Sequence, residues 1–290
     1  MVHIQKSFEG QQAKLYIVPT PIGNLEDMTF RSVDTLKMVD LIACEDTRQS
    51  KKLMNHFEIE TALVSYHEHN KFAREEELIT KLKNGNNIAI VSDAGMPMIS
   101  DPGYEMVRRA REEEIDVVVL PGANAALTAL VGSGLPAYSF TFYGFLPRKK
   151  KELKEVLNSL KDQKQTMIFY ESPYRMKQTL EIMKGVYPAD RGVTVARELT
   201  KKFEEYINGT VEEVSEYFQS KKAETRGEFC LIVEGGEGQE VTETSWWEGL
   251  SIIEHVEQHI EQGLSAKDAI KQTSQERNMP KREVYQEYHQ

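Results

Sequence analysis

The sequence predicts an α/β fold, and two regularities support this prediction. Short apolar runs alternate along the chain with stretches in which apolar residues recur every three or four positions. The first pattern is typical of buried strands and the second of amphipathic helices. Because the two patterns alternate, we expect a mainly parallel sheet covered by helices. Glycine- and proline-rich segments follow several apolar runs, as tight loops at strand ends do.

Residues 1–132 are expected to form a first α/β lobe. Its predicted strands are Leu15–Val18, Leu41–Cys44, Ile88–Val91 and Val117–Leu120. Its predicted helices, in which the apolar residues share one face, are Phe30–Met38, Arg74–Leu82 and Tyr104–Arg111. The sequence GSGLP at Gly132–Pro136 then interrupts the pattern and predicts a hinge between lobes.

Residues 133–238 are expected to form a second α/β lobe. Its predicted strands are Phe140–Tyr143, Met167–Tyr170, Val193–Ala196 and Phe229–Val233. Its predicted helices are Lys151–Leu160, Arg175–Met183 and Val211–Phe218. The segment Glu234–Ser245 is rich in glycine, glutamate and threonine and has no apolar periodicity, so we expect a linker there.

Residues 239–290 are expected to comprise the end of this linker and a small helical module. Ser265, followed by an aspartate three residues later, predicts the start of one helix. Pro280 predicts the start of the next helix, in which Val284 and Tyr285 are expected to face inward. The pattern fits a helix-turn-helix-like unit and equally a plain α-hairpin packed on the body.

Composition limits the classes of function. The chain of 290 residues is 40% apolar and 28% charged, which suits a globular protein with a real core. A net charge of −10 argues against a non-specific nucleic-acid binder, which should be basic. The apolar runs are too short to span a membrane, and Met1–Gly10 lacks the apolar centre of a secretory signal. We therefore predict a cytoplasmic protein that does not act at a membrane.

Cysteine and histidine usage predicts neither a disulfide nor a metal site. Cys44 and Cys230 each lie inside an apolar run and are predicted to be buried thiols. His67 and His69 are two residues apart and have no third ligand nearby in the sequence. We interpret them as loop residues near a cleft.

Three loops rich in glycine, proline and small residues each follow a predicted strand. They are Pro19–Asn24, Ser92–Gly103 and Pro121–Ala126. Open α/β sheets bind ligands at the carboxyl ends of their strands, and the third loop also opens a helix whose free N–H groups can receive an anion. None of the loops fits a P-loop or the spaced-glycine dinucleotide motif. We predict one small-molecule pocket formed by backbone and small residues.

Six segments, in the right order, resemble the tetrapyrrole methylase superfamily and more narrowly its bacterial ribosomal RNA small-subunit methyltransferase I branch. They are LYIVPTPIGNLEDMTFRSVDTLKMVDLIACEDTR, VSDAGMPMISDPGYEMV, LPGANAALTAL, FYGFLPRKKK, YESPYRM and ARELTKKFEEY. The resemblance spans about Leu15 to Glu234, and Ser265–Tyr288 is similar to the C-terminal appendage of that branch. Tetrapyrrole enzymes carry a GPGD-like first loop where this chain has PIGN, a departure that favours the RNA branch.

The resemblance implies a two-lobed fold with a cleft between the lobes that binds S-adenosylmethionine. It also implies a homodimer that methylates the ribose 2′-hydroxyl of a cytidine in the decoding region of 16S rRNA. The acidic charge favours an acceptor within an assembled or partly assembled small ribosomal subunit over loose RNA. Two alternatives stay open: a methyltransferase for a tetrapyrrole or other small acceptor, and a non-catalytic RNA- or ribosome-binding protein.

Carried over by motif, the expected cofactor contacts come from the three loops and from the FYGFLP segment. They are Thr20, Pro21, Asp93, Ala94, Gly95, Met96, Ile99, Ala123, Asn124, Ala125, Phe145 and Leu146. The small residues among them can form a flat slot for adenine. Asp93 is expected to face the pocket, whereas Asp101 is expected either to cap a helix ahead of Pro102 or to bind the cofactor.

Methyl transfer to a hydroxyl is helped by a general base, and acidic residues at strand ends are the candidates. These candidates are Glu45, Asp46, Glu171 and Glu198. Our hypothesis is that Glu45, Arg48 and Glu198 face the substrate cleft, with Glu198 as the base. The alternative is structural: ion pairing among Glu45, Asp46 and Arg48, and pairing of Glu198 with Arg197 or Arg175.

The basic run Arg148-Lys149-Lys150-Lys151 directly follows the cofactor-adjacent FYGFLP. We expect these four residues to contact RNA phosphate at the mouth of the cleft. The alternative is an ordinary solvated start of a helix. Trp246 and Trp247 could serve a dimer contact, although packing within the terminal module explains them more simply.

Overall fold

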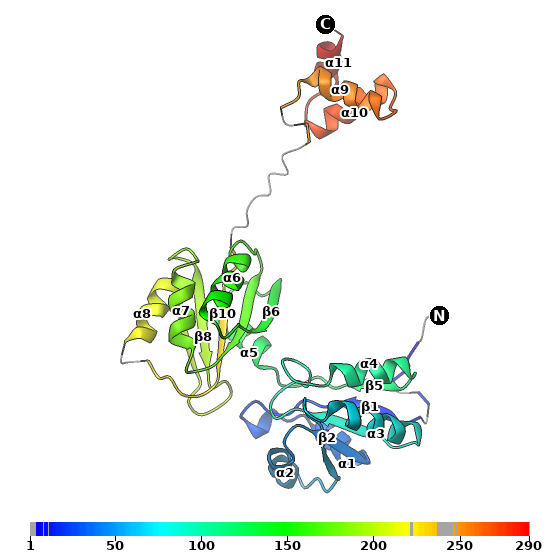
Figure 1. The fold of residues 1–290 in the computed structure, drawn as a ribbon, viewed down its shortest axis with the longest axis vertical. Helices are drawn as coiled ribbons and strands as arrows, with labels where there is room; N and C mark the ends of the chain where they lie inside the picture. Colours follow the sequence, from blue (N-terminus) through cyan, green and yellow to red (C-terminus); the bar gives the residue numbers. More distant parts are fainter. Residues whose placement is uncertain are drawn as a thin grey trace. The chain divides into compact units, whose positions relative to one another are not determined.

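The computed structural model describes residues 4–7, 9–10, 12–220, 223–236, 246–247 and 249–289 (Figure 1). It divides into two compact units, Met1–Gly236 and Glu237–Gln290. The first unit contains two five-stranded sheets with their helices, and the second contains three helices. No helix in the described ranges is long and apolar enough to cross a membrane.

The first sheet has the strand order β3-β2-β4-β1-β5, and every neighbouring pair in it is parallel. Its strands are β1 (Lys14–Ile17), β2 (Leu41–Cys44), β3 (Leu63–Ser65), β4 (Ile88–Val91) and β5 (Asp116–Val119). The three loops singled out in the sequence follow β1, β4 and β5, which are neighbours. These loops therefore lie together at the carboxyl end of the sheet, as predicted.

Helices cover both faces of this sheet, so its strands are buried on both sides. They are α1 (Phe30–Met38), α2 (Thr47–His56), α3 (Lys71–Lys83) and α4 (Tyr104–Glu112), with a short 3-10 turn, η1 (Leu25–Asp27). Ile90 and Val117 belong to the apolar cluster on one face, and their neighbours Val91 and Val118 to the cluster on the other. This alternation is the period of a strand, and it explains why the strands read as continuous apolar runs.

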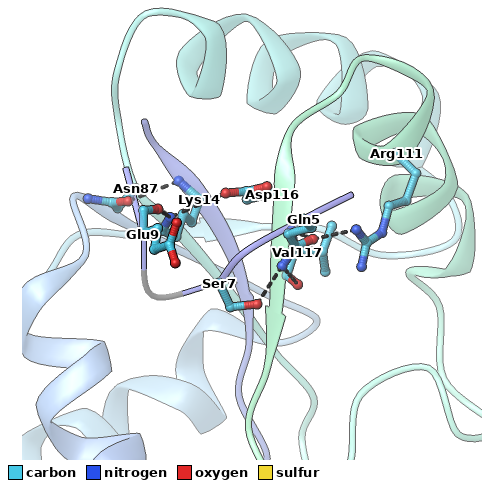
Figure 2. A network of polar contacts seen from close by, with 8 residues as sticks. All are labelled: Gln5, Ser7, Glu9, Lys14, Asn87, Arg111, Asp116 and Val117. Carbon is cyan, nitrogen blue, oxygen red and sulfur yellow. Dashed lines mark hydrogen bonds and ion pairs between the residues drawn. The ribbon is translucent and has the colours of Figure 1, made fainter. Parts of the chain in front are cut away.

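The N-terminal segment is hydrogen-bonded to the edge strand β5 (Figure 2). The bonds lie near the start of β5, and the three loops lie at the opposite, carboxyl end of the sheet. The Gln5 amide donates to the Val117 carbonyl (2.8 Å) and accepts from the Val117 N–H (3.0 Å), so it mimics a neighbouring strand on β5. Lys14 pairs with Asp116 at 3.3 Å, and both side chains are largely buried. These bonds satisfy backbone groups that an edge strand would otherwise leave open.

The second sheet has the order β6-β7-β10-β8-β9, and only β6 and β7 are parallel. Its strands are β6 (Phe140–Phe145), β7 (Thr166–Glu171), β8 (Gly192–Arg197), β9 (Glu205–Thr210) and β10 (Phe229–Val233). The expectation of a mainly parallel sheet is wrong here. A connection as short as residues 198–204 can join β8 and β9 only as antiparallel neighbours.

The two faces of the second sheet are covered by helices from different parts of the chain. On one face lie α6 (Lys150–Leu160), α7 (Met176–Lys184) and α8 (Val211–Gln219), whose apolar residues join one cluster with the sheet. On the other face lies α5 (Ala125–Ser133), which packs Ala126, Ala129 and Leu130 against Ile168 and Cys230. The helix that follows the third loop therefore packs on the second sheet and joins the two lobes.

The C-terminal unit is a bundle of α9 (Ile252–Glu261), α10 (Ala266–Glu276) and α11 (Lys281–Tyr288). The Ser265 hydroxyl caps α10 as predicted, accepting from the Asp268 N–H at 3.2 Å. Val284 is fully buried, but Tyr285 is 54% exposed, so the inward placement of Tyr285 is wrong. Adjacent helix positions differ by about 100°, and α11 buries only one narrow stripe. The predicted linker lies outside the described residues from residue 237 onward.

Candidate functional site

A cavity of about 360 Å³ lies at the carboxyl ends of β1, β4 and β5, a size typical of small-molecule sites. The first lobe contributes wall residues from the three loops: Ile22, Ala94, Gly95, Met96, Ile99, Ser100, Asp101, Asn124 and Ala125. The second lobe contributes Phe145, Tyr170, Glu171, Ser172, Pro173, Ala196, Leu199, Gly227, Glu228, Phe229 and Cys230. Most of the second set was not predicted.

Backbone pairing between the first two loops shapes the floor of the cavity. The Thr20 N–H donates to the Gly95 carbonyl (2.9 Å), and the Gly95 N–H donates back to the Thr20 carbonyl (3.0 Å). Gly95 has φ +79°, and a Cβ there would lie 3.1 Å from the Ile22 side chain. Only glycine meets both conditions without strain. Thr20 is buried behind this floor and supports it.

Backbone strain is concentrated where the two lobes meet around the cavity. Four non-glycine residues there have left-handed φ values: Met98 (72°), Ser100 (65°), Glu198 (51°) and Thr200 (67°). The Asn24 N–H donates across the lobes to the Thr200 hydroxyl (3.1 Å), and a Cβ on Gly144 would lie 3.1 Å from the Ser100 hydroxyl. Such strain persists only where the surrounding structure enforces it, and it is typical of functional sites.

Seven of the expected cofactor contacts line the cavity, namely Ala94, Gly95, Met96, Ile99, Asn124, Ala125 and Phe145. The other five are not part of its wall: Thr20, Pro21, Asp93, Ala123 and Leu146. Leu146, at 2% exposure, is enclosed in the core of the second lobe. The residues carried over by motif thus indicate where the cavity lies, although five of them are not part of its wall.

Of the two aspartates of the second loop, Asp101 and not Asp93 lies in the cavity wall, so the expectation that Asp93 faces the pocket is wrong and the pocket alternative for Asp101 is right. Asp93 is exposed and accepts the Asp46 N–H at 3.3 Å, whereas Asp101 lines the cavity. Asp101 does not cap α4, because Gly103, with φ 127°, occupies that position. Burial, together with the nearby carboxylates of Glu45 and Asp93, raises the pKa of Asp101 to about 6. A carboxyl with such a pKa can exchange protons near neutral pH.

Glu198, the expected base, is engaged in ion pairing beside the cavity. Its Oε1 accepts from Lys201 Nζ (2.9 Å) and from the Glu228 N–H (2.9 Å). Burial favours a higher pKa, but these donors outweigh it, so the pKa of Glu198 lies below its ordinary value. The alternative that Glu198 forms an ion pair is therefore right, but its partner is Lys201 and neither Arg197 nor Arg175. Arg197 pairs with Glu205 at 3.0 Å.

Glu45 and Arg48, the other two residues expected in the cleft, also lie outside the cavity wall. Arg48 forms a pair with Asp46 (2.9 Å) and its side chain is 88% exposed. The ionic alternative therefore describes Asp46 and Arg48 correctly. Glu45 is exposed, and it reaches the site only through its electrostatic effect on Asp101.

A buried ion pair connects the cavity wall with the basic run. The Glu171 carboxylate, with its side chain fully buried, accepts from the Thr179 hydroxyl (2.6 Å) and lies 3.4 Å from the Arg175 guanidinium. Arg175 in turn donates to the carbonyls of Leu146 (3.1 Å) and Pro147 (2.7 Å). It thereby fixes the turn that leads into the run at 148–151.

The four basic residues of this run are all exposed. Arg148 and Lys149 precede α6, while Lys150 and Lys151 form its first turn. Of these four residues, Lys149 pairs with Glu152 at 2.8 Å. Positive charge at a helix N-terminus is unfavourable because the macrodipole is positive there. Helix stability therefore does not explain the run, and an external anion would.

Comparison with known proteins now identifies the fold and the type of reaction. Residues 14–215 match the family described as tetrapyrrole (corrin/porphyrin) methylases. The chain belongs to the tetrapyrrole methylase family. It is 56% identical to ribosomal RNA small subunit methyltransferase I of Bacillus subtilis (strain 168) over 292 residues, covering 100% of this chain and 99% of the relative. It is 54% identical to the protein of that name from Halalkalibacterium halodurans, with 99% of each chain covered.

Solved structures of this family confirm the two-lobed fold. Uroporphyrin-III-C-methyltransferase from Thermus thermophilus superimposes with a TM-score of 0.52 at 19% identity, covering 77% of this chain and 94% of that one. The cobalamin biosynthetic enzyme cobalt precorrin-4 methyltransferase gives 0.55 at 16% identity, covering 76% and 94%. The resemblance found in the sequence, and with it S-adenosylmethionine as cofactor of this methylase, is thereby confirmed.

The chemistry of the cavity wall fits S-adenosylmethionine. Ala125, Leu199 and the ring of Phe145 offer apolar surface for the adenine. The Asp101 and Glu171 carboxylates offer negative charge to a ligand with a sulfonium and an ammonium group. Among the described residues that line the wall, none is a lysine or arginine that would repel such a cation.

A second polar cluster lies inside the C-terminal module. His255 and His259 on α9 both direct Nε2 to one oxygen of Glu276 on α10, at 2.7 and 3.1 Å. These donors could suggest a metal site, but Arg277 Nε donates to His255 Nδ1 at 3.0 Å. His255 Nε2 then carries the proton given to Glu276 and cannot ligate a metal. We interpret the cluster as a buried hydrogen-bond network closed by Trp246 and Trp247.

This network is expected to make the module sensitive to acid. Burial lowers the pKa of His255, and its bond to Glu276 offsets only part of that effect; the pKa of Glu276 is lowered as well. Both groups bind more protons when unfolded, so the contribution of His255 is lost as pH falls below about 6.5 and that of Glu276 only below about 4.5. Both tryptophans of the chain lie in the module, so their fluorescence reports its melting. We expect a lower melting temperature at pH 5.5 than at pH 7.5; an unchanged value would contradict the assignment.

Proposed function

We propose that this methylase acts on the ribose 2′-hydroxyl of a cytidine in the decoding region of 16S rRNA. Identity above 50% over the full length to relatives named for small-subunit ribosomal RNA is the observation that carries the proposal. The cavity supports it, because it opens beside an exposed basic run suited to RNA phosphates. The PIGN first loop, which departs from the GPGD-like pattern, favours RNA over a tetrapyrrole acceptor.

The residues of the cavity divide the work of the proposed reaction. S-adenosylmethionine, when bound, supplies a methyl group activated by its sulfonium. The second and third loops align it, and the enclosing second lobe excludes water. Asp101 takes the proton from the attacking hydroxyl, since it lies in the cavity and its pKa of about 6 leaves it ionised at neutral pH. Glu198 has a structural role beside the cavity, because it pairs with Lys201, which also pairs with Glu228.

Label transfer separates this proposal from its alternatives. The protein is incubated with radiolabelled S-adenosylmethionine and, separately, naked 16S rRNA, assembled 30S subunits and a tetrapyrrole precursor. We expect label in RNA, and more of it with subunits than with naked RNA, because a chain of net charge −10 binds loose RNA weakly. Label in the precursor would support a small-molecule methylase, and RNA binding without label a non-catalytic protein.

The basic run is expected to bind RNA phosphate. Replacing Lys149, Lys150 and Lys151 by glutamine should weaken RNA binding and reduce the slope of log K against log salt by about 2. Cofactor affinity should stay unchanged, because none of the three lines the cavity. Filter binding at several salt concentrations measures the slope, and calorimetry measures the cofactor. Loss of cofactor binding with an unchanged slope would contradict this role.

We also propose that the protein is a homodimer. Large apolar side chains are exposed along three consecutive elements, two of which are edge strands: Val119 (57%) on β5, Leu127 (48%) and Val131 (77%) on α5, and Phe140 (41%) on β6. A second copy of the chain would cover such surface together with the edge strands β5 and β6. Trp246 and Trp247 are not needed for this contact, since they pack on His255.

Val131→Glu tests the dimer. A charge at this exposed position of α5 should convert the dimer to a monomer in light scattering, with little change in folding. Phe72→Glu is the matched control, since Phe72 is 79% exposed on α3. A wild-type protein that runs as a monomer would contradict the proposal.

A further inference from the structure

Two aromatic side chains stand exposed next to residues of the cavity wall. Tyr174 is 93% exposed and directly follows the wall residue Pro173. Phe203 is 64% exposed and lies in the connection 198–204, which contains the wall residue Leu199. Neither ring belongs to an apolar core cluster of the described residues.

The strand register brings both rings to one end of the second sheet. Phe229 pairs with Glu171 on one side and with Arg197 on the other, so the segments after β7 and β8 and the segment before β10 share that end. Phe145 pairs with Tyr170, and because β6 and β7 are parallel, the segment after β6 emerges there too. Tyr174, Phe203 and the basic run therefore all belong to the rim of the cavity.

Contacts within this rim place positive charge beside each ring. Arg175, which directly follows Tyr174 in the chain, donates to the Pro147 carbonyl just before the basic run at 148–151. Lys202 Nζ lies 5.6 Å from the centre of the Phe203 ring. Exposed rings interleaved with cations form the surface on which unpaired bases stack while their phosphates are neutralised.

We propose that Tyr174 and Phe203 are stacking platforms for unpaired RNA bases that flank the target nucleotide. This inference rests on the proposed function and specifies its substrate as a segment whose bases are free of pairing at the site. A base stacked inside an A-form helix offers no free face to a side chain, and a nucleotide must leave its helix to enter an enclosed cavity. The basic run then gives affinity, while the two rings select unpaired over paired RNA.

Binding of short RNAs tests the inference with the full chain loaded with S-adenosylmethionine. The probes are a 20-nucleotide decoding-region strand and the same strand annealed to its complement, followed by fluorescence anisotropy. We expect wild type to prefer the single strand, and Tyr174→Ala and Phe203→Ala each to weaken its binding by about tenfold. The salt slope should be unchanged, unlike that of the lysine variant. Tyr174→Trp and Phe203→Trp should restore binding.

Phe72→Ala is the matched control, because its ring is exposed on α3 of the first lobe, and it should bind as wild type does. Equal binding of the duplex and the single strand by wild type would overturn the inference. So would alanine variants that bind like wild type while wild type methylates RNA. Failure of wild type to methylate any RNA would instead overturn the proposed function.

Discussion

Replacing Asp101 by asparagine is expected to lower the rate of methyl transfer by about 10²–10⁴-fold. The amide keeps the shape of the side chain but cannot take the proton of the acceptor hydroxyl. The wild-type rate should rise with pH through about 6, because only the ionised Asp101 is a base. The asparagine variant should lose this dependence. Single-turnover methyl transfer measures the rate, and calorimetry checks that the variant still binds the cofactor.

Glu198→Gln is the control for this assignment. Its carboxylate is held by Lys201 and the Glu228 N–H and does not line the cavity, so turnover with saturating RNA should stay near normal. Asp93→Asn is a second control, since Asp93 is exposed in the same loop as Asp101. An inactive Glu198→Gln variant together with an active Asp101→Asn variant would show that Glu198 is the base and contradict the role of Asp101.

Arg175→Met is expected to lower the free energy of unfolding of the first unit by about 3–5 kcal/mol. The substitution leaves the Glu171 carboxylate buried and without its cation, and it frees the Leu146 and Pro147 carbonyls. Urea denaturation followed by far-UV circular dichroism measures the loss; tryptophan fluorescence would not, since both tryptophans lie in the other unit.

The double variant Arg175→Met with Glu171→Gln should regain most of this stability, because no buried charge is then left unpaired. Lys184→Met offers a comparison at a more exposed pair, with Glu212 at 3.1 Å, where a loss of about 1 kcal/mol or less is expected. Equal losses at the two sites would show that burial of Glu171 does not govern the effect.

The residues that the first lobe contributes to the cavity could be predicted from the sequence, because they lie in short segments that directly follow recognisable strands. Each loop follows an apolar strand, and parallel strands bring their carboxyl ends together. The second-lobe half depends on the register of β10 between β7 and β8, which brings Pro173, Leu199 and Gly227 together from distant segments. No local pattern contains that register, so these residues were missed. The short strand β3 and the polar strand β9 were missed because neither has a clear apolar run.

The placement of Asp93 and Asp101 shows a second limit of sequence reasoning. Between these two aspartates the backbone is left-handed at Met98 and Ser100, a conformation that ordinary residues rarely adopt. A signal was nevertheless present, since SDPG could be interpreted either as a helix cap or as part of the pocket. Glu198 was chosen because it follows a strand, but the sequence did not reveal that Lys201 folds back onto it.

The position of the transferred methyl group tests the central claim most directly. Small subunits labelled with radioactive methyl from S-adenosylmethionine are extracted, and their 16S rRNA is hydrolysed completely with alkali. A methyl on the ribose 2′-oxygen blocks cleavage at its own phosphate, so we predict label in a single alkali-stable dinucleotide that begins with cytidine. Label released as mononucleotides would place the methyl on a base and contradict the account.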